Sequence, residues 1–275
     1  MRRKYQMINE KAKVSIIMGA YNSENCIDTA IQSIIEQTYT NWELIICDDA
    51  STDNTYELLL KWKKIDSRIY PIRNAKNLGL ARTLNHCLKY STGEFIARMD
   101  DDDWSYPERI QKQVNFLNNN KEYAFVSSAV DIFDGQTITH KQNVRAITPI
   151  KEDFLWNSPF VHPATMFRKE SLVRVKGYRY AKETRRAEDI DLFMRMYAKG
   201  MKGYNISESL LRYYVNPYAM KKRKYKYRID EAIVRYKGYK MLGLMPKGLL
   251  YVIKPLVVGL IPKGMILNLQ KRIYR

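Results

Sequence analysis

Carboxylates are the side chains of this 275-residue chain whose grouping most clearly predicts chemistry. Four consecutive aspartates (100–103) end the apolar run 94–99, and the pair Asp48 and Asp49 ends a second apolar run, 44–47. Adjacent carboxylates repel one another, so ionised neighbours need a compensating cation. Mg²⁺ and Mn²⁺ prefer oxygen ligands and commonly join carboxylates to substrate phosphates. The pattern favours a metal–phosphate site over a solvated acidic loop.

The elements that must position these carboxylates follow from the apolar pattern. Short β-branched runs predict buried strands at 14–18, 44–47, 69–72 and 94–99. Apolar residues at helical spacing predict helices at 27–35, 56–62, 80–88 and from Pro107 onward. This alternation predicts a parallel sheet with helices on both faces. Ligands of such sheets bind beyond the carboxyl ends of the strands, where the carboxylates would converge.

Composition and missing motifs exclude several classes. A chain with 45% hydrophobic and 28% charged residues is an ordinary globular protein. The three cysteines fit neither a disulfide framework nor a zinc site. No glycine-rich dinucleotide fingerprint or P-loop is present. A metal is therefore expected to hold a diphosphate here, and Trp156 is expected in the core.

Charge divides the chain into three parts. The net charge is +18, but residues 14–217 are almost neutral. Residues 1–13 form a basic N-terminal arm, and residues 218–275 carry fifteen basic and two acidic side chains. We expect a catalytic domain at 14–217 and a basic amphipathic segment at 218–275. Positive charge concentrated in one segment predicts a polyanionic partner, either lipid headgroups or nucleic acid.

The basic segment has the pattern of a membrane-surface helix. The run 221–228 is densely basic, and Ile229, Ala232, Ile233 and Tyr236 form an apolar stripe after it. The apolar stretch 249–262 is too short to span a bilayer and contains a lysine and a proline. The N-terminus lacks the pattern of a signal peptide. We expect a cytoplasmic protein bound peripherally to the inner face of the cell membrane through an anionic surface.

Several motifs together resemble the inverting family 2 glycosyltransferases of bacterial surface-polysaccharide synthesis, which have the GT-A fold. The resemblance covers roughly residues 14–215. It is carried by VSIIMGAYN (14–22), ELIICDDASTDNT (43–55), GEFIARMDDDD (93–103) and, later, Glu188-Asp189 followed by Asp191-Leu192. It implies a Rossmann-like nucleotide half, a mainly parallel sheet flanked by helices, and a nucleotide diphosphate sugar as donor, most often a UDP-sugar.

The resemblance also implies roles for the residues at the strand ends. Ala20, Tyr21 and Asn22 would line the nucleobase and ribose pocket, and Asp49 would accept a hydrogen bond from uracil N3. Asp101 would lie near the ribose. Asp102 would ligate Mn²⁺ or Mg²⁺, with Asp100 nearby as a second ligand. Four consecutive aspartates leave the register of this D-x-D motif open by one residue.

The Glu188-Asp189 motif is expected to supply the catalytic base. Asp189 would be the catalytic base that takes the proton of the acceptor hydroxyl, although a carboxylate at a helix start also serves as an N-terminal cap. Glu188 and His162 would lie on the acceptor or metal side of the site. Alternatively, His162 is a satisfied histidine before a buried strand. The acceptor is expected to be a glycan or a polyprenyl-diphosphate-linked sugar.

Two other functions compete with glycosyl transfer. The basic tail could belong to a nucleic-acid-binding protein, but acidic strand ends on a neutral domain would repel a duplex, so no nucleic-acid partner is expected. A sugar-phosphate nucleotidyltransferase would use similar metal carboxylates. It would take a nucleoside triphosphate and a sugar phosphate in place of a UDP-sugar.

Overall fold

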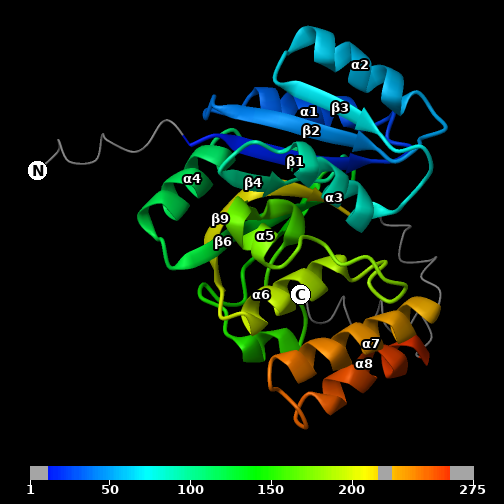
Figure 1. Ribbon diagram of the computed structural model, residues 1–275, viewed down its shortest axis with the longest axis vertical. Helices are drawn as coiled ribbons and strands as arrows, with labels where there is room; N and C mark the ends of the chain where they lie inside the picture. The colour runs from blue at the N-terminus through cyan, green and yellow to red at the C-terminus, as the bar shows by residue number, and fades with distance from the viewer. Residues whose placement is uncertain (1–11, 216–224, 261–275) are drawn as a thin grey trace, which may run out of the picture.

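The computed structural model describes residues 12–215 and 225–260, which form one continuous sheet with helices on both faces (Figure 1). Most of the N-terminal arm, the basic residues 216–224 and the chain end 261–275 lie outside the described residues. The strands are β1 (Val14–Ala20), β2 (Trp42–Asp48), β3 (Ile69–Arg73), β4 (Phe95–Arg98), β5 (Trp104–Ser105), β6 (Tyr123–Phe133), β7 (Ile138–Gln142), β8 (Met166–Arg168) and β9 (Lys202–Tyr214). The α-helices are α1 (Ile27–Ile35), α2 (Thr55–Ile65), α3 (Leu80–Tyr90), α4 (Arg109–Asn119), α5 (Lys169–Arg174), α6 (Glu188–Ala198), α7 (Lys226–Met241) and α8 (Leu249–Leu260).

The first four strands form the parallel half of the sheet. The strand order of the whole sheet is β3-β2-β1-β4-β8-β6-β9-β5, with β7 paired to β6. Within it, β1, β2, β3 and β4 pair in parallel. All four lie where the apolar runs predicted them, and the predicted parallel arrangement is confirmed. The fourth predicted helix begins at Arg109 and not at Pro107, which lies in the turn before α4.

The second half of the sheet is mixed. β8 lies antiparallel between β4 and β6, and β9 pairs in parallel with β6 and antiparallel with the short β5. Because β5 directly follows the aspartates 100–103, its pairing with β9 fixes that acidic segment against the far side of the sheet. The expected sheet was mainly parallel, and the structure adds these antiparallel pairs to it.

Each face of the sheet has its own apolar core. α1 covers one face through Ile27, Ala30, Ile31 and Ile34, the helical stripe that the sequence predicted. α3 and α6 cover the opposite face, where Phe125, Phe167 and Phe193 pack together. The two layers hold the strand ends, and therefore the site, in fixed register.

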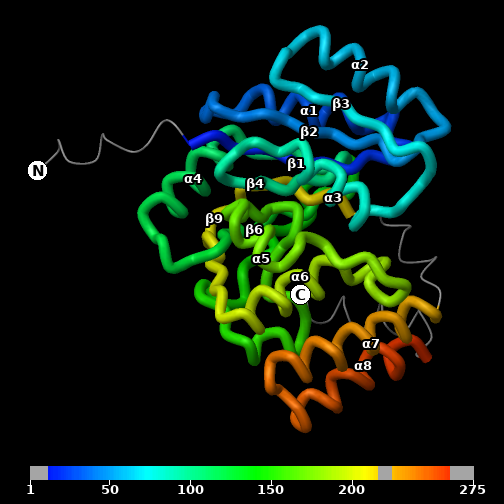
Figure 2. Tube along the Cα trace, in the orientation of Figure 1, coloured from blue at the N-terminus to red at the C-terminus, as the bar shows by residue number. Residues whose placement is uncertain are grey.

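The C-terminal helices α7 and α8 lie side by side at the end of the molecule opposite α2 (Figures 1 and 2). α7 packs on α6, and the buried side of α7 is formed by Ala232, Val234, Arg235, Gly238 and Tyr239. The predicted apolar stripe of α7 therefore faces mainly outward, since Ile229, Ile233 and Tyr236 are exposed.

Trp156 corrects one expectation. Its side chain is 54% exposed, and the ammonium of Lys254 in α8 lies 3.3 Å from its ring centroid. The expected core position was wrong, because Phe154 fills the core position of this segment and Trp156 packs against Lys254 at the surface. Within the described residues, no helix has both the length and the apolarity needed to cross a bilayer.

Candidate active site

Three polar strand ends meet at the carboxyl edge of the parallel strands, as the alternating pattern predicted. The backbone N–H of Asp49 donates to the carbonyl of Ala20 at 2.8 Å, which joins the ends of β2 and β1. The carboxylate of Asp101, after β4, accepts from the backbone N–H of Tyr21 at 3.3 Å and from the hydroxyl of Ser23. Ala20 is buried, whereas the ring of Tyr21 is 47% exposed and faces solvent beside the cluster.

The turns at these strand ends have unusual backbone conformations. Asn22 and Ala50 have φ angles of 54° and 59°, in the left-handed region that residues other than glycine rarely adopt. The side-chain oxygen of Asn22 accepts from the backbone N–H of Thr52 at 2.9 Å, which ties the two turns together. Strained backbone of this kind gathers at ligand sites, where the surrounding structure holds it in place.

Asp49 organises the loop that leads into α3. One of its carboxylate oxygens accepts from Asn74 Nδ2 and from the backbone N–H of Leu78, and the other accepts from that of Gly79, each at 2.8 Å. The side chain is buried. Asp49 therefore holds the loop before α3 in place.

The aspartates 100–103 divide into two groups. Asp100, Asp102 and Asp103 each offer a carboxylate oxygen, and these oxygens lie within 4.8 Å of one another. Asp101 points instead toward Tyr21 and Ser23. Asp102 is the most exposed of the four, while Asp103 is buried. The structure brings together Asp100 and Asp102, the two ligands that the resemblance implied, and adds Asp103, which a register shifted by one residue would include.

The donor set fits a hard divalent cation. Asp103 Oδ1 accepts from the backbone N–H of Tyr214 at 2.9 Å, but the buried Oδ2 has no hydrogen-bond partner among the described residues. A buried carboxylate oxygen without a partner is costly, and a metal ligand position would satisfy it. Three converging carboxylates with an exposed member match the oxygen-rich, partly open coordination of Mg²⁺ or Mn²⁺.

Arg98, the last residue of β4, is the cation beneath this cluster. Its side chain is 2% exposed, and its Nη2 donates to the carboxylate of Asp100. Its Nε and Nη1 have no hydrogen-bond partner in the described part of the chain. This role was not predictable from the sequence, because an arginine after an apolar run is usually solvated.

Burial and neighbouring negative charges raise the pKa values of Asp101 and Asp102. Burial is the main cause of the rise in the pKa of Asp101 to about 6, and the charge of Asp100 adds to it. Burial, and then the charges of Asp100 and Asp101, raise the pKa of Asp102 to about 7. The same causes act on carboxylates that share one site in other proteins.

Glu188 and Asp189 begin α6 on the same side of the molecule. Burial and the charge of Asp189 raise the pKa of Glu188, and burial also raises the pKa of Asp189. The charges of Arg98 and Asp100 act on both of these carboxyl groups, because α6 brings them to the end of β4. Glu188 Oε2 is buried and has no hydrogen-bond partner within the described residues.

His162 is buried beside the carboxylates. Its ring is 5% exposed, and its Nε2 shares a 2.8 Å hydrogen bond with the hydroxyl of buried Tyr178. Burial, followed by the charge of Arg98, lowers the pKa of His162 well below its usual value. The ring is therefore a neutral hydrogen-bonding group next to Arg98.

Comparison with known proteins matches the family model "Glycosyl transferase family 2" over residues 15–176. EpsE of Bacillus subtilis (strain 168), which carries a glycosyltransferase name, is 38% identical over 96% of this chain and 95% of its own length. The Escherichia coli protein WfgD, a UDP-Glc:alpha-D-GlcNAc-diphosphoundecaprenol beta-1,3-glucosyltransferase, is 39% identical over 46% of this chain and 49% of its own length.

Solved structures share the fold. Staphylococcus aureus TarS (1–349) in complex with UDP-GlcNAc superposes with a TM-score of 0.70 at 17% identity, over 88% of this chain and 73% of that one. The mannosyltransferase PcManGT from Pyrobaculum calidifontis, in complex with GDP-Man and Mn²⁺, gives 0.64 at 20% identity, over 95% and 80%. The predicted GT-A fold is confirmed. The chain thus belongs to glycosyl transferase family 2 and is a glycosyltransferase.

Proposed function

We propose that this enzyme transfers a sugar from a UDP-sugar to a hydroxyl group of a lipid-linked glycan during surface-polysaccharide synthesis, with inversion at the anomeric carbon. The observation that carries the proposal is the meeting of two acidic groups at one sheet edge, residues 100–103 and the pair Glu188–Asp189, around Arg98. One group suits a diphosphate-bound metal, and the other suits proton transfer.

The donor would lie across the ends of β1, β2 and β4. Ala20, Tyr21 and Asn22 would line the nucleoside, with the exposed ring of Tyr21 available for stacking on the base. Asp49 would face uracil N3, and Asp101 would lie near the ribose. Asp49 already holds the backbone of Leu78 and Gly79, which would form one wall of this pocket.

Asp102 and Asp100 would hold Mn²⁺ or Mg²⁺, with the free oxygen of buried Asp103 as a further ligand. When bound, such an ion stabilises the charge on a leaving diphosphate. Arg98 holds Asp100 in place from below. Asp102, the most exposed of these carboxylates, would be the ligand that the donor diphosphate approaches.

Asp189 would act as the base. The acceptor oxygen forms a bond to the anomeric carbon, the bond from that carbon to the UDP oxygen breaks, and the acceptor proton passes to the Asp189 carboxylate. A single displacement of this kind inverts the configuration and needs no carboxylate nucleophile, in contrast to retaining glycosidases. Glu188 and the neutral His162–Tyr178 pair would lie behind Asp189 on the acceptor side.

The acceptor assignment is supported by relatives. WfgD and WfaP of Escherichia coli are named for transfer to alpha-D-GlcNAc-diphosphoundecaprenol, and TuaG of Bacillus subtilis is named for teichuronic acid biosynthesis. A lipid-linked acceptor would require the enzyme to work at a membrane surface. We propose that α7 and α8 supply that contact at the inner face of the cell membrane.

The surface of α8 has the composition of an interfacial helix. Five aliphatic side chains are exposed along it, and Leu250 and Leu260 are 78% and 74% exposed. The five are Leu249, Leu250, Ile253, Val257 and Leu260. Trp156 and Lys254 lie together beside this row, and Lys and Trp are typical of the headgroup region of a bilayer.

The experiment that tests the reaction uses radiolabelled UDP-sugars and a synthetic GlcNAc-diphosphate-lipid, with Asp189→Asn as the informative variant. We expect turnover to fall by about 10²–10⁴-fold, the usual contribution of a general base, while UDP binding measured by calorimetry is unchanged. Glu152→Gln, on an exposed carboxylate away from the site, is the control.

Three results would count against the proposal. These are full activity of Asp189→Asn, a product that retains the donor's anomeric configuration, and formation of a UDP-sugar from UTP and a sugar phosphate. The last of these would identify a nucleotidyltransferase.

A further inference from the structure

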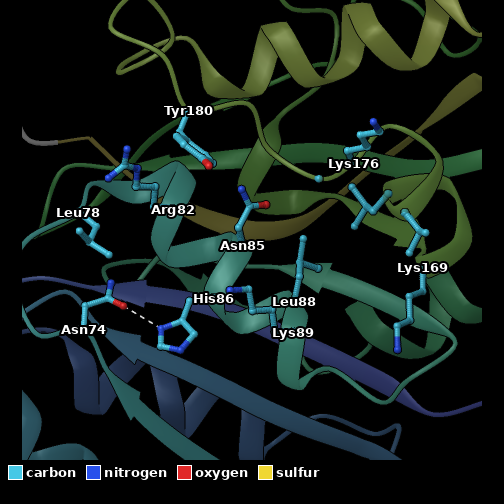
Figure 3. Close-up of a pocket in the computed structure, with 13 residues that line it drawn as sticks. Asn74, Leu78, Arg82, Asn85, His86, Leu88, Lys89, Lys169, Lys176 and Tyr180 are labelled. Carbon is cyan, nitrogen blue, oxygen red and sulfur yellow. Dashed lines mark hydrogen bonds between the residues drawn. The ribbon is translucent and has the colours of Figure 1, made fainter.

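A groove of about 840 Å³ lies between α3 on one side and α5 with the following residues 176–180 on the other (Figure 3). Asn74, Leu78 and Arg82 form the end of the groove near the loop that Asp49 holds. Lys89, Lys169 and Lys176 line the remainder, away from that loop. The groove therefore starts beside the proposed donor pocket and leads away from it.

The charge of the groove is of one sign. Four of its lining side chains are cationic (Arg82, Lys89, Lys169 and Lys176), and none of those that the structure describes there is acidic. Lys89 and Lys176 are exposed and take part in no ion pair within the described part of the chain. Lys169 Nζ donates to the carbonyl of Ser91 at 2.6 Å, which leaves Lys89 and Lys176 as the freer cations. Because residues 14–217 are almost neutral overall, this concentration of cations favours an anionic ligand.

The cations are spread along a line. Arg82, Asn85, His86 and Lys89 occupy one face of α3, and Lys89 comes seven positions after Arg82, about 10 Å along a helix. On the facing wall, Lys169 begins α5 and Lys176 follows its end. Figure 3 shows Lys169 and Lys176 across the groove from Arg82. A small anion would need convergent donors, whereas this spacing suits an extended chain with repeated charges.

The two walls are fixed to each other. Asn85 Nδ2 donates to the carbonyl of Tyr178 at 2.7 Å, and the backbone N–H of Tyr178 donates to Asn85 Oδ1 at 2.9 Å. Gly177, with a φ of +63°, passes so close that an added Cβ would lie 2.5 Å from Asn85 Oδ1. A groove with rigid walls loses little conformational entropy when a ligand binds.

Apolar surface lies between the cations. Leu78, Leu88 and Val173 line the groove. The ring of Tyr180 is 59% exposed, and the guanidinium of Arg82 lies 4.5 Å from its centroid. Aliphatic and aromatic surface beside charged groups suits a sugar ring, which has an apolar C–H face as well as polar substituents.

We propose that this groove is a binding site, outside the donor pocket, for an anionic glycan chain that carries carboxylate or phosphate groups. The proposal rests on the proposed function, since it makes the enzyme's glycan acceptor or product a charged polymer. Lys89 and Lys176 contact the charges, and Tyr180, Leu78 and Leu88 contact the rings. The donor site and the site for the anionic glycan then lie on either side of Asn74 and Leu78.

The test measures binding of hexagalacturonate, a carboxylated hexasaccharide, by calorimetry to the full chain and to Lys89→Gln/Lys176→Gln. We expect binding to the wild type, a loss of about tenfold or more in the double variant, and no binding of uncharged maltohexaose. Lys63→Gln/Lys64→Gln, on exposed lysines of α2, is the matched control and should bind as the wild type does.

Other results would overturn the proposal. These are no binding of hexagalacturonate to the wild type, an equal loss in the α2 control, or full displacement by an equal concentration of inorganic diphosphate, which would mark a simple anion site. Tighter binding of duplex DNA that is lost in the same double variant would assign the groove to nucleic acid. UDP binding by each variant is measured alongside, so failure of the groove is distinguishable from failure of the donor site.

Discussion

Among single residues, Arg98 has the largest influence on the site. Six carboxyl groups, residues 100–103 with Glu188 and Asp189, lie at one sheet edge, and the charge of Arg98 lowers the pKa of Asp102, Glu188 and Asp189. The guanidinium is buried and reaches Asp100 directly. It therefore partly offsets the mutual repulsion of the carboxylates in the free enzyme.

Replacement of Arg98 by methionine should destabilise the fold. Removal of one partner from a buried pair leaves an uncompensated charge, which typically costs about 3–5 kcal/mol. We expect a loss of this order for Arg98→Met in the free energy of urea unfolding. Arg98→Lys keeps the charge and should lose less. Equal stability of the wild type and the methionine variant would contradict the role assigned to this side chain.

The ionisation of Glu43 predicts how the stability of the fold changes with pH. Burial opposes its ionised form, but hydrogen bonds from Lys13, Ser15 and Thr92 prevail and lower its pKa from 4.5 to about 2. A carboxyl whose pKa is lower in the folded state stabilises the protein fully above pH 4.5. That contribution is lost as the pH falls toward 2.

We expect Glu43→Gln to lose about 2 kcal/mol of unfolding free energy at pH 7, after allowance for the half-exposed Lys13. The difference from the wild type should shrink at pH 3. Urea unfolding at the two pH values measures it, and Glu57→Gln, exposed on α2, should show no such change. A constant difference between pH 7 and pH 3 would contradict the assigned ionisation.

The site carboxylates could be predicted from the sequence more readily than the buried groups that hold them in place. The aspartates at 48–49 and 100–103 follow apolar runs, so their place at the sheet edge came from the pattern alone. Asp189 needed the family resemblance, because a carboxylate at a helix start is ordinary. Arg98 and the free oxygen of Asp103 could not be predicted, since their burial depends on packing between β4, β9 and α6.

At the scale of elements, local pattern decided what could be predicted. β1 to β4 and the helices between them lie where the periodicity placed them, because each strand is followed by its own crossover helix. The mixed half was not predicted, since β6 pairs with β9 and β8 over long separations in the chain. The outward stripe of α7 and the exposed Trp156 likewise depend on how α6 and α8 pack.

Substitution of Gly93 tests whether the close approach of the chain before β4 to β1 is required for stability. It precedes β4, and an added Cβ would lie 2.6 Å from the backbone carbonyl oxygen of Lys13 and the backbone nitrogen of Ser15. Neither backbone atom can move without displacing β1. We expect Gly93→Ala to lose about 1–3 kcal/mol of unfolding free energy.

Gly19→Ala is the milder control, because its methyl would meet only the side chains of Leu80 and Thr83, at 3.1 and 3.2 Å. Thermal or urea unfolding of both variants measures the comparison. A Gly93→Ala protein as stable as the wild type would show that the close approach between these strands is not required.

At the scale of the whole molecule, α2 and the pair α7–α8 lie at opposite ends (Figure 1). The exposed aliphatic row lies on α8, which belongs in sequence to the basic segment 218–275. This polarity would orient the enzyme, with α8 against a bilayer and the sheet edge open to its substrates.

Glutamate substitutions on α8 should therefore release the protein from vesicles. Leu250→Glu/Val257→Glu removes two exposed apolar side chains and adds charge that anionic lipid repels. In flotation with phosphatidylglycerol-containing vesicles we expect at least tenfold weaker binding. Ile65→Glu, at a 69% exposed position of α2, should bind as the wild type does. Equal binding of all three proteins would contradict a contact through α8.

The central claim is that the strand-end carboxylates bind a nucleotide diphosphate through a divalent metal, and calorimetry of UDP with and without Mn²⁺ tests it most directly. We predict Mn²⁺-dependent binding by the wild type and by Glu152→Gln, and a loss of about a hundredfold or more in Asp102→Asn, since a metal ligand is removed. Binding of UDP that is independent of Mn²⁺ and unchanged in Asp102→Asn, or no binding under any metal condition, would contradict the claim.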